Sequence, residues 1–143
     1  MTRASLPERA VAAHVDSHLA TEFGEVMAAL VATVPGARGA VLTDRDGHAI
    51  DFALDAGAID DLDLQIAGAQ CARTLAAMHH LAQRRALGRT AVLVEASAGC
   101  LLGATLREAD ELTIVLVLRA RAHLGFALAA FDRACDELAR LIA

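Results

Sequence analysis

Residues 37–53, ARGAVLTDRDGHAIDFA, decide the fold, because two apolar runs flank one short polar loop. The runs predict two β-strands, Gly39–Asp44 and His48–Ala53. In the second strand Ile50 and Phe52 share one face, as alternating residues of a half-buried strand do. The loop between the strands is therefore either a catalytic cluster or only the bend of a hairpin.

The loop carries Asp44, Arg45, Asp46 and His48 around a single glycine. Aspartate side chains hydrogen-bond to the nearby backbone in tight turns, and glycine tolerates positive φ. A tight hairpin with a bulge therefore explains every residue type in the loop. We interpret the loop as a bend.

A helix is predicted ahead of this hairpin, and it ends at Pro35–Gly36. Residues 5–8, Ser-Leu-Pro-Glu, have the form of a capping box, which predicts an earlier helical start. Gly24 divides the pattern into an extension and a main helix. We expect an N-terminal helical extension, residues 1–18, before the domain proper, residues 19–143. The stripe of the main helix is Leu19, Phe23, Val26, Leu30 and Val34.

A long helix is predicted over residues 59–87, with acids in its first turn and basic residues near its end, as the macrodipole favours. It carries two apolar stripes. One stripe would cover a sheet, and the other needs a further surface that no remaining helix supplies. The sequence leaves open which stripe faces the sheet. The first is Ile59, Leu62, Ile66, Ala69 and Ala76; the second is Leu64, Ala67, Cys71, Leu75, Met78 and Leu81.

Three strands follow, at Thr90–Ala96, Cys100–Leu106 and Leu112–Leu118, and a helix from Ala122 to Ile142 closes the chain. The last strand, LTIVLVL, is apolar at six of seven positions, which predicts burial on both faces at the centre of a sheet. The order α-β-β-α-β-β-β-α predicts an α+β fold. Its five-stranded antiparallel sheet would carry helices on both faces.

The chain has 143 residues and is 56% hydrophobic, with a mean hydropathy of +0.44. No run of about 18 uninterrupted apolar residues predicts a membrane span, and the first residues lack the apolar core of a secretory signal. The apolar excess therefore favours burial against another chain. The net charge of −5 excludes a basic nucleic-acid footprint. Three cysteines without CxxC spacing predict buried thiols in a reducing, cytoplasmic environment: Cys71, Cys100 and Cys135.

Candidate nucleophiles have a simpler structural interpretation. The stretch EASAG, residues 95–99, nearly matches a nucleophile elbow around Ser97. However, Glu95 replaces the first glycine, and a strand follows where the elbow needs a helix. Cys100 has no neighbouring base in the sequence. Without lysine there is no Walker A motif, and no GxGxxG occurs. We therefore expect no catalytic site, no cofactor and no enzymatic activity.

The candidate metal ligands also have simpler structural interpretations. His14 and His18 are four residues apart and could share an ion, but no third ligand is evident. His79 and His80 point about 100° apart on a helix and cannot easily chelate one ion. The acids near the long helix lack the glycine and terminal glutamate of an EF-hand, so we expect no metal site: Asp55, Asp60, Asp61 and Asp63.

Three stretches together resemble the Roadblock (dynein light chain) domain family. VPGARGAVLTDRDGHAI, residues 34–50, looks like its first hairpin, where a helix ends in Pro-Gly and a strand leads into an Asp-x-x-Gly turn. VLVEASAGCLLGATLREADELTIVLVL, residues 92–118, resembles its three later strands, and RAHLGFALAAFDRACDELARLI, residues 121–142, its closing helix. The resemblance covers residues 19–143 and implies the profilin-like Roadblock fold.

The resemblance also implies a homodimer. In the family, the third strand of each protomer pairs with its mate, and the second helices pack together. Those elements are Thr90–Ala96 and the helix with two apolar stripes, so the apolar excess and the family's dimer mode indicate the same surface. A stable dimer would bury about 800 Å² per protomer. The expected interface residues are Leu64, Cys71, Leu75, Met78, Val92 and Val94.

Family members bind Ras-like small GTPases, and some bacterial ones stimulate GTP hydrolysis while controlling polarity and motility. The resemblance therefore implies a non-enzymatic, cytoplasmic regulator or adaptor of a small GTPase, with neither nucleic acid nor membrane insertion. The exposed-looking candidates for an arginine finger are Arg45, Arg84 and Arg85. The alternative is a small-ligand sensor of profilin-like architecture that holds an apolar ligand between sheet and helix.

Overall fold

The protein is described by a computed structural model over residues 21–55, 57–86, 90–106 and 109–142. The element order agrees with the predicted one, and the predicted extension, residues 1–18, lies outside the described residues. The elements are α2 (Glu22–Thr33), β1 (Ala37–Thr43), β2 (Ala49–Leu54), α3 (Asp61–Arg84), β3 (Ala91–Ala96), β4 (Gly99–Leu106), β5 (Ala109–Arg119) and α4 (Leu124–Ile142).

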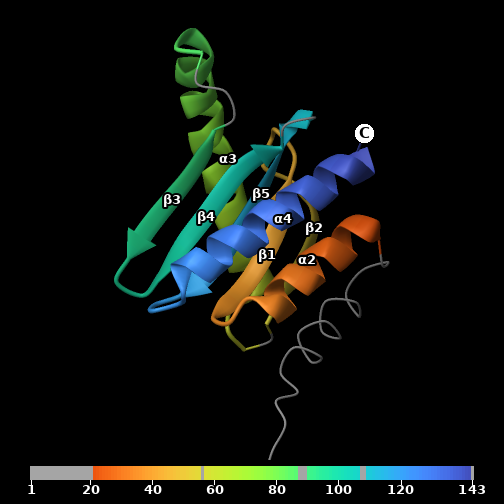
Figure 1. Ribbon diagram of the computed structural model, residues 1–143, viewed down its shortest axis with the longest axis vertical. Helices are drawn as coiled ribbons and strands as arrows, with labels where there is room; N and C mark the ends of the chain where they lie inside the picture. The colour runs from red at the N-terminus through yellow and green to blue at the C-terminus, as the bar shows by residue number, and fades with distance from the viewer. Residues whose placement is uncertain (1–20, 56, 87–89, 107–108, 143) are drawn as a thin grey trace, which may run out of the picture.

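One antiparallel sheet of five strands forms the middle layer, in the order β2-β1-β5-β4-β3. Helices α2 and α4 lie side by side over one face, and α3 crosses the other (Figure 1). The predicted fold class is confirmed. Strand β5 lies at the centre, as its apolar sequence predicted, and Val115 and Leu116 have no exposed surface. Strands β2 and β3 are the two edges.

Each face of the sheet has its own hydrophobic core. Beneath α2 and α4, Met27, Phe131 and Leu138 pack with Leu116 from the sheet. Beneath α3, a smaller cluster joins the helix to the opposite faces of the same strands, and it contains Val41, Phe52, Leu64, Cys71, Leu75, Val115 and Val117. The stripe of α3 that faces the sheet is therefore the one that contains Leu64, Cys71 and Leu75.

Two glycines explain how closely α3 approaches the sheet. A Cβ atom on Gly68 of α3 would lie 2.8 Å from methyl groups of both Val41 and Thr43. On the strand side, a Cβ atom on Gly103 would lie 2.4 Å from the sulfur of Cys71. Neither position can hold a side chain without displacing a neighbour, so the helix lies directly on β1 and β4.

The helix termini are set by polar side chains. Thr21 precedes α2, where its hydroxyl oxygen accepts a hydrogen bond from the Gly24 amide at 2.9 Å and donates one to the Asp51 carboxylate. The break that we expected at Gly24 therefore falls at Thr21, because this cap starts the helix three residues earlier. Asp60 caps α3 through the Asp63 amide at 2.8 Å. Within the described ranges, no helix combines the length and apolarity that crossing a bilayer requires.

Candidate functional site

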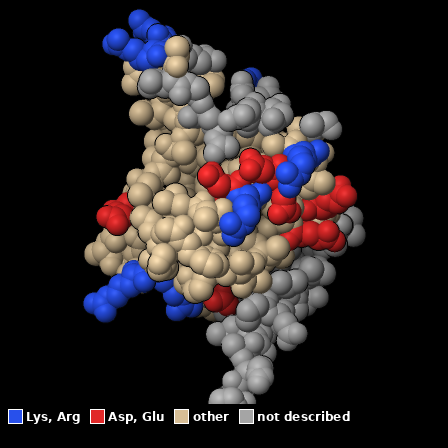
Figure 2. All heavy atoms as spheres, viewed as in Figure 1, with Lys and Arg blue, Asp and Glu red and all other residues tan. Residues whose placement is uncertain are grey.

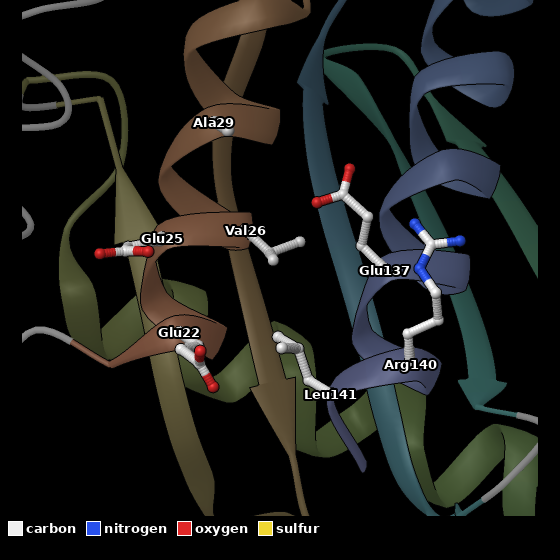
Figure 3. Close-up of a pocket in the computed structure, with 7 residues that line it drawn as sticks. All are labelled: Glu22, Glu25, Val26, Ala29, Glu137, Arg140 and Leu141. Atoms are coloured by element: carbon white, nitrogen blue, oxygen red, sulfur yellow. The ribbon is translucent and has the colours of Figure 1, made fainter. Parts of the chain in front are cut away.

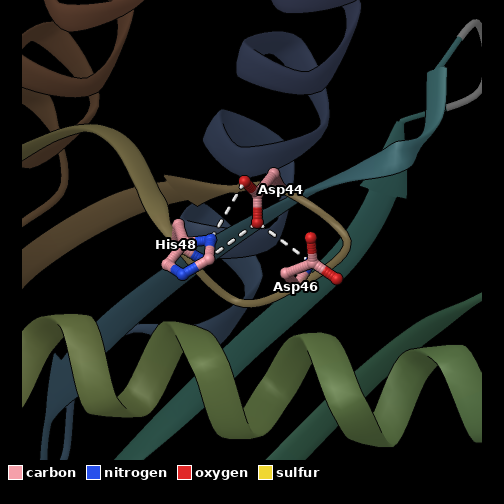
Figure 4. Close-up of side chains that lie close together, drawn as sticks. All are labelled: Asp44, Asp46 and His48. Carbon is pink, nitrogen blue, oxygen red and sulfur yellow. Dashed lines mark hydrogen bonds and ion pairs between the residues drawn. The ribbon is translucent and has the colours of Figure 1, made fainter.

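The loop between β1 and β2 is a hydrogen-bonded turn. The Asp44 Oδ1 atom accepts bonds from the amides of Asp46 and His48, both at 2.9 Å, and Asp44 Oδ2 lies 3.4 Å from His48 Nδ1 (Figure 4). Gly47 has a φ of +88°, which favours glycine there. The side chains of Asp44, Asp46 and His48 lie close enough to approach one cation, and the turn contacts account for those of Asp44 and His48. The interpretation as a bend is confirmed.

The same contacts make the turn sensitive to acid. The backbone hydrogen bond from His48 is the largest cause that lowers the pKa of Asp44 below its ordinary value of 3.8. A carboxyl group whose pKa is lower in the folded state stabilises the protein above its unfolded pKa, and this stabilisation is lost as the pH falls through the folded value. We expect Asp44→Ala to be less stable than the parent at pH 7. The difference should disappear in the most acidic buffers, which thermal unfolding from neutral pH downward measures.

The candidate nucleophiles do not form a catalytic pair. Ser97 lies exposed in the turn between β3 and β4, and a strand follows it, so the elbow geometry is absent. Burial, with a further contribution from Glu95, raises the pKa of the Cys100 thiol. Cys100 is only half-buried, which corrects the expectation that all three thiols are buried; Cys71 and Cys135 are buried. The reason is that Cys100 lies near the start of β4, beside the exposed β3–β4 turn.

The candidate charged groups lie apart. Arg45 is in the β1–β2 turn, Arg84 is the last residue of α3, and Arg85 follows it in a turn; all three are exposed. Asp55 lies 3.6 Å from the guanidinium of Arg119, and Asp60 is the α3 cap. His14 and His18 lie outside the described residues.

The two sheet edges differ in how they resist further strand pairing. On β2, the Asp51 carboxylate is buried and bonded to Thr21, and the β1–β2 register shifts at Leu42/Thr43. Inward-pointing charges and bulges are features that protect an edge strand. Strand β3 pairs with β4 in an unbroken register and carries one charged residue, Glu95. The edge that is open to another strand is therefore β3.

The outer side of α3 carries exposed large apolar side chains beside polar ones such as Gln70 and Arg73. Leu62 is 64% exposed and Ile66 is 49% exposed, although both are large aliphatic residues. Strand β3 adds large exposed side chains on both of its faces, because Leu93 and Val94 point in opposite directions along the strand. We call this set the β3–α3 surface: Leu62, Ile66, Met78, Leu81, Leu93 and Val94.

The expected interface residues divide into two groups. Leu64, Cys71 and Leu75 are at most 5% exposed because they pack on the sheet, so their side chains are not available to a second chain. Val92 is half-buried against the same core. Met78 and Val94 belong to the β3–α3 surface. Leu93 was not among the expected interface residues, although the alternation of side chains along β3 indicates that it points outward.

The alternative function is a sensor that holds a small ligand between sheet and helix. The grooves found over the described residues do not support it. One groove of about 570 Å³ lies at the end of the sheet, beside Cys100, Arg119 and Arg121. Two others, of about 340 and 90 Å³, lie between the outer sides of α2 and α4, and Figure 3 shows the larger of them. None enters either core.

Comparison with solved structures identifies the fold. A Roadblock/LC7 domain from Streptomyces avermitilis superposes with a TM-score of 0.69 over 85% of this chain and 98% of that chain, at 18% identity. The gliding protein MglB from Thermus thermophilus gives 0.69 over 98% and 93%, at 23% identity. An MglB with a tetrameric arrangement gives 0.70 over 85% and 91%, at 25% identity.

No protein-family model matches the sequence, and no curated protein matches it. The resemblance to the Roadblock family is therefore confirmed by three-dimensional structure. The chain has the Roadblock fold over nearly the full length of the similar domains.

Proposed function

We propose that this protein is a homodimeric, non-enzymatic regulator or adaptor of a Ras-like small GTPase in the cytoplasm. The observation that carries the proposal is the β3–α3 surface, a set of exposed large apolar side chains on α3 and on the unprotected edge strand of a Roadblock fold. The proposal therefore names two partners, a second copy of the chain and a GTPase.

The open edge of β3 supports the proposed dimer. Pairing β3 with its counterpart around a two-fold axis satisfies the free backbone groups of both edges and joins two sheets into one. The same axis brings the two α3 helices together, which would cover Leu62, Ile66 and Leu81. The similarity to an MglB with a tetrameric arrangement supports self-association in this fold.

A regulatory role agrees with the chemistry of the candidate groups. Ser97 and Cys100 lack the geometry or the lowered pKa of an activated nucleophile, whereas the folds that superpose include Roadblock domains and MglB. Any effect on GTP hydrolysis would then come from arranging the partner's own groups or from an exposed arginine. Arg84, the last residue of α3, and Arg85, directly after it, are the candidates next to the helix of the proposed dimer contact.

The test is direct binding to Ras-like GTPases encoded by the same genome, each loaded with GDP or with a non-hydrolysable GTP analogue. We expect one of them to bind, with a preference for one nucleotide state. Single-turnover GTP hydrolysis with and without the protein then separates stimulation from scaffolding. If it is stimulated, Arg84→Ala with Arg85→Ala tests the arginine-finger assignment, and Arg133→Ala on α4 is the control. Failure to bind any of these GTPases in either state would contradict the proposal.

A further inference from the structure

Strand β3 forms an open margin of the sheet. In Figure 1 the face of β3 toward the viewer is covered by neither α2 nor α4, which pack on the other four strands. Figure 2, from the same side, shows mostly uncharged atoms at this margin, whereas the acidic atoms of the view gather mainly over the ends of α2 and α4. A second sheet can therefore approach β3 edge to edge without meeting a helix or a cluster of charges.

The free edge of β3 exposes a definite set of backbone groups. The Thr105 amide donates a hydrogen bond to the Thr90 carbonyl at 3.4 Å, and this pair lies one step beyond the register that joins β3 to β4. In an antiparallel ladder the direction of the backbone groups alternates from one residue to the next. The N–H and C=O groups of Ala91, Leu93 and Glu95 therefore point away from β4, toward the free edge.

The turn that joins β3 to β4 leads to the same assignment. It consists of two residues, Ser97 and Ala98, between the paired residues Ala96 and Gly99. A turn of this length is closed by a hydrogen bond between the residues before and after it. Ala96 therefore directs its backbone groups toward β4, and the residue before it directs them outward.

A two-fold axis restricts how two copies of this edge can pair. When antiparallel strands are related by such an axis, paired residues have side chains on the same face of the joined sheet. Because successive side chains face opposite sides, one residue of β3 must lie on the axis, opposite its own counterpart. The two residues at the middle of the strand, where most of β3 finds a partner, are Leu93 and Val94.

The backbone groups favour Leu93 on the axis. Leu93 then forms a hydrogen-bonded pair with its counterpart, and Ala91 forms one with the partner's Glu95 on either side of the axis. Every outward N–H and C=O group of these three residues is paired. With Val94 on the axis, the backbone groups of Ala91 would instead lie opposite the turn at Ser97. Because backbone groups that lose water without gaining a partner are costly, the first arrangement is the more stable.

The side chains agree with this arrangement. Leu93 is 45% exposed and would pack on its own counterpart, while Val94, 44% exposed, would lie opposite the partner's Val92. Apolar cross-strand pairs stabilise a sheet, and like charges directly opposite one another destabilise it. Glu95, the one charged residue of β3, would lie opposite the small Ala91 and about 13 Å along the strand from its own counterpart.

We propose that the homodimer pairs β3 with its counterpart in one register, centred on Leu93, so that Ala91 of each protomer lies opposite Glu95 of the other. This inference rests on the homodimer proposed above and adds which residues meet across it. Leu93 pairs with Leu102, whose side chain belongs to the core beneath α2 and α4. The centre of the interface is therefore a leucine pair on the face of the sheet opposite α3.

Disulfide trapping tests the register in the full chain, with Cys100→Ser removing the half-buried thiol while Cys71 and Cys135 stay buried. Residues of a directly opposed, hydrogen-bonded pair have Cα atoms about 5.5 Å apart, within the reach of a disulfide. After oxidation with diamide, Leu93→Cys should give a covalent dimer of 29.8 kDa, twice 14.9 kDa, on a non-reducing gel. Val94→Cys should be cross-linked at least several-fold less, because its Cα would lie about 8 Å from its counterpart.

Leu128→Cys, at a 44% exposed position on α4, measures cross-linking by random collision and should give almost none. Light scattering of each reduced variant shows whether it is a dimer before oxidation. Cross-linking of Val94→Cys in place of Leu93→Cys, or of both equally, would overturn the register. A dimer in which neither variant is cross-linked would also overturn it and leave the homodimer standing, whereas a monomeric parent would contradict the homodimer and the register together.

A second test uses charge and does not depend on cysteine chemistry. Ala91 is exposed and in this register lies opposite the partner's Glu95. Ala91→Arg should therefore lower the dimer dissociation constant several-fold at low salt, and Ala91→Glu should raise it several-fold. With Val94 on the axis, position 91 would instead lie opposite the uncharged Ser97. Equal dissociation constants for the two variants would overturn the proposal.

Discussion

Ile66→Glu is expected to dissociate the proposed dimer of 29.8 kDa, twice the protomer mass of 14.9 kDa, into monomers. Ile66 lies on the outer side of α3 and is 49% exposed in the isolated chain, so glutamate there leaves the protomer core intact. In the proposed dimer this carboxylate would be buried without a partner. Light scattering coupled to size-exclusion chromatography measures the change.

The expected effect is large because a two-fold interface contains the substitution twice. One buried, unpaired charge costs about 3 kcal/mol or more, so the dissociation constant should rise at least ~100-fold. At micromolar concentration that is enough to dissociate a dimer of moderate affinity.

Ile50→Glu is the matched control. Ile50 lies on β2, the protected edge, and is 46% exposed. The same substitution is therefore made at a position almost as exposed as Ile66, but away from the proposed interface. We expect this variant to remain a dimer. A parent protein that is already monomeric, or a dimer that survives Ile66→Glu but not Ile50→Glu, would contradict the assignment of the interface to the β3–α3 surface.

Leu75→Ala is expected to lower the free energy of unfolding by about 3 kcal/mol, because it leaves a cavity between α3 and the sheet. Leu75 has no exposed surface and packs in the core cluster beneath α3. In a domain of this size the melting temperature should fall by about 10 °C. Chemical and thermal unfolding, followed by circular dichroism at one fixed protein concentration, measure both quantities.

Leu81→Ala is the control for this variant on the same helix. Leu81 is 49% exposed and belongs to the β3–α3 surface. Its loss should change the stability of the protomer by less than about 1 kcal/mol and should weaken self-association instead. Equal losses of stability in the two variants would show that the division of α3 into a core side and an outer side is wrong.

The hairpin at residues 37–53 is a part of the fold that local sequence alone could predict. Its turn forms through contacts among Asp44, Asp46 and His48, which lie within four residues of one another. Such contacts depend on nearby residues alone, so the sequence predicted the turn and the strands beside it. The central position of β5 was predictable too. A strand whose two faces are both apolar is expected to be covered on both faces, and such a strand lies inside the sheet.

The helix termini and the open edge needed more than the local pattern. The start of α2 depends on Thr21, whose hydroxyl bonds to Asp51, 30 residues further along the chain. The contrast between β2 and β3 depends on that same buried contact. The half-exposed position of Cys100 likewise follows from where β4 ends in the sheet.

The sequence by itself determined the order of the elements, the hairpin turn, the central strand and the presence of two apolar stripes on α3. Only the tertiary structure decided that Leu64, Cys71 and Leu75 lie against the sheet while Leu62 and Ile66 face outward. Helical periodicity defines the sides of a helix but carries no information about what each side meets. That choice is made by close packing, here by Gly68 over Val41 and Thr43 and by Gly103 beneath Cys71, where α3 can approach the sheet in one orientation.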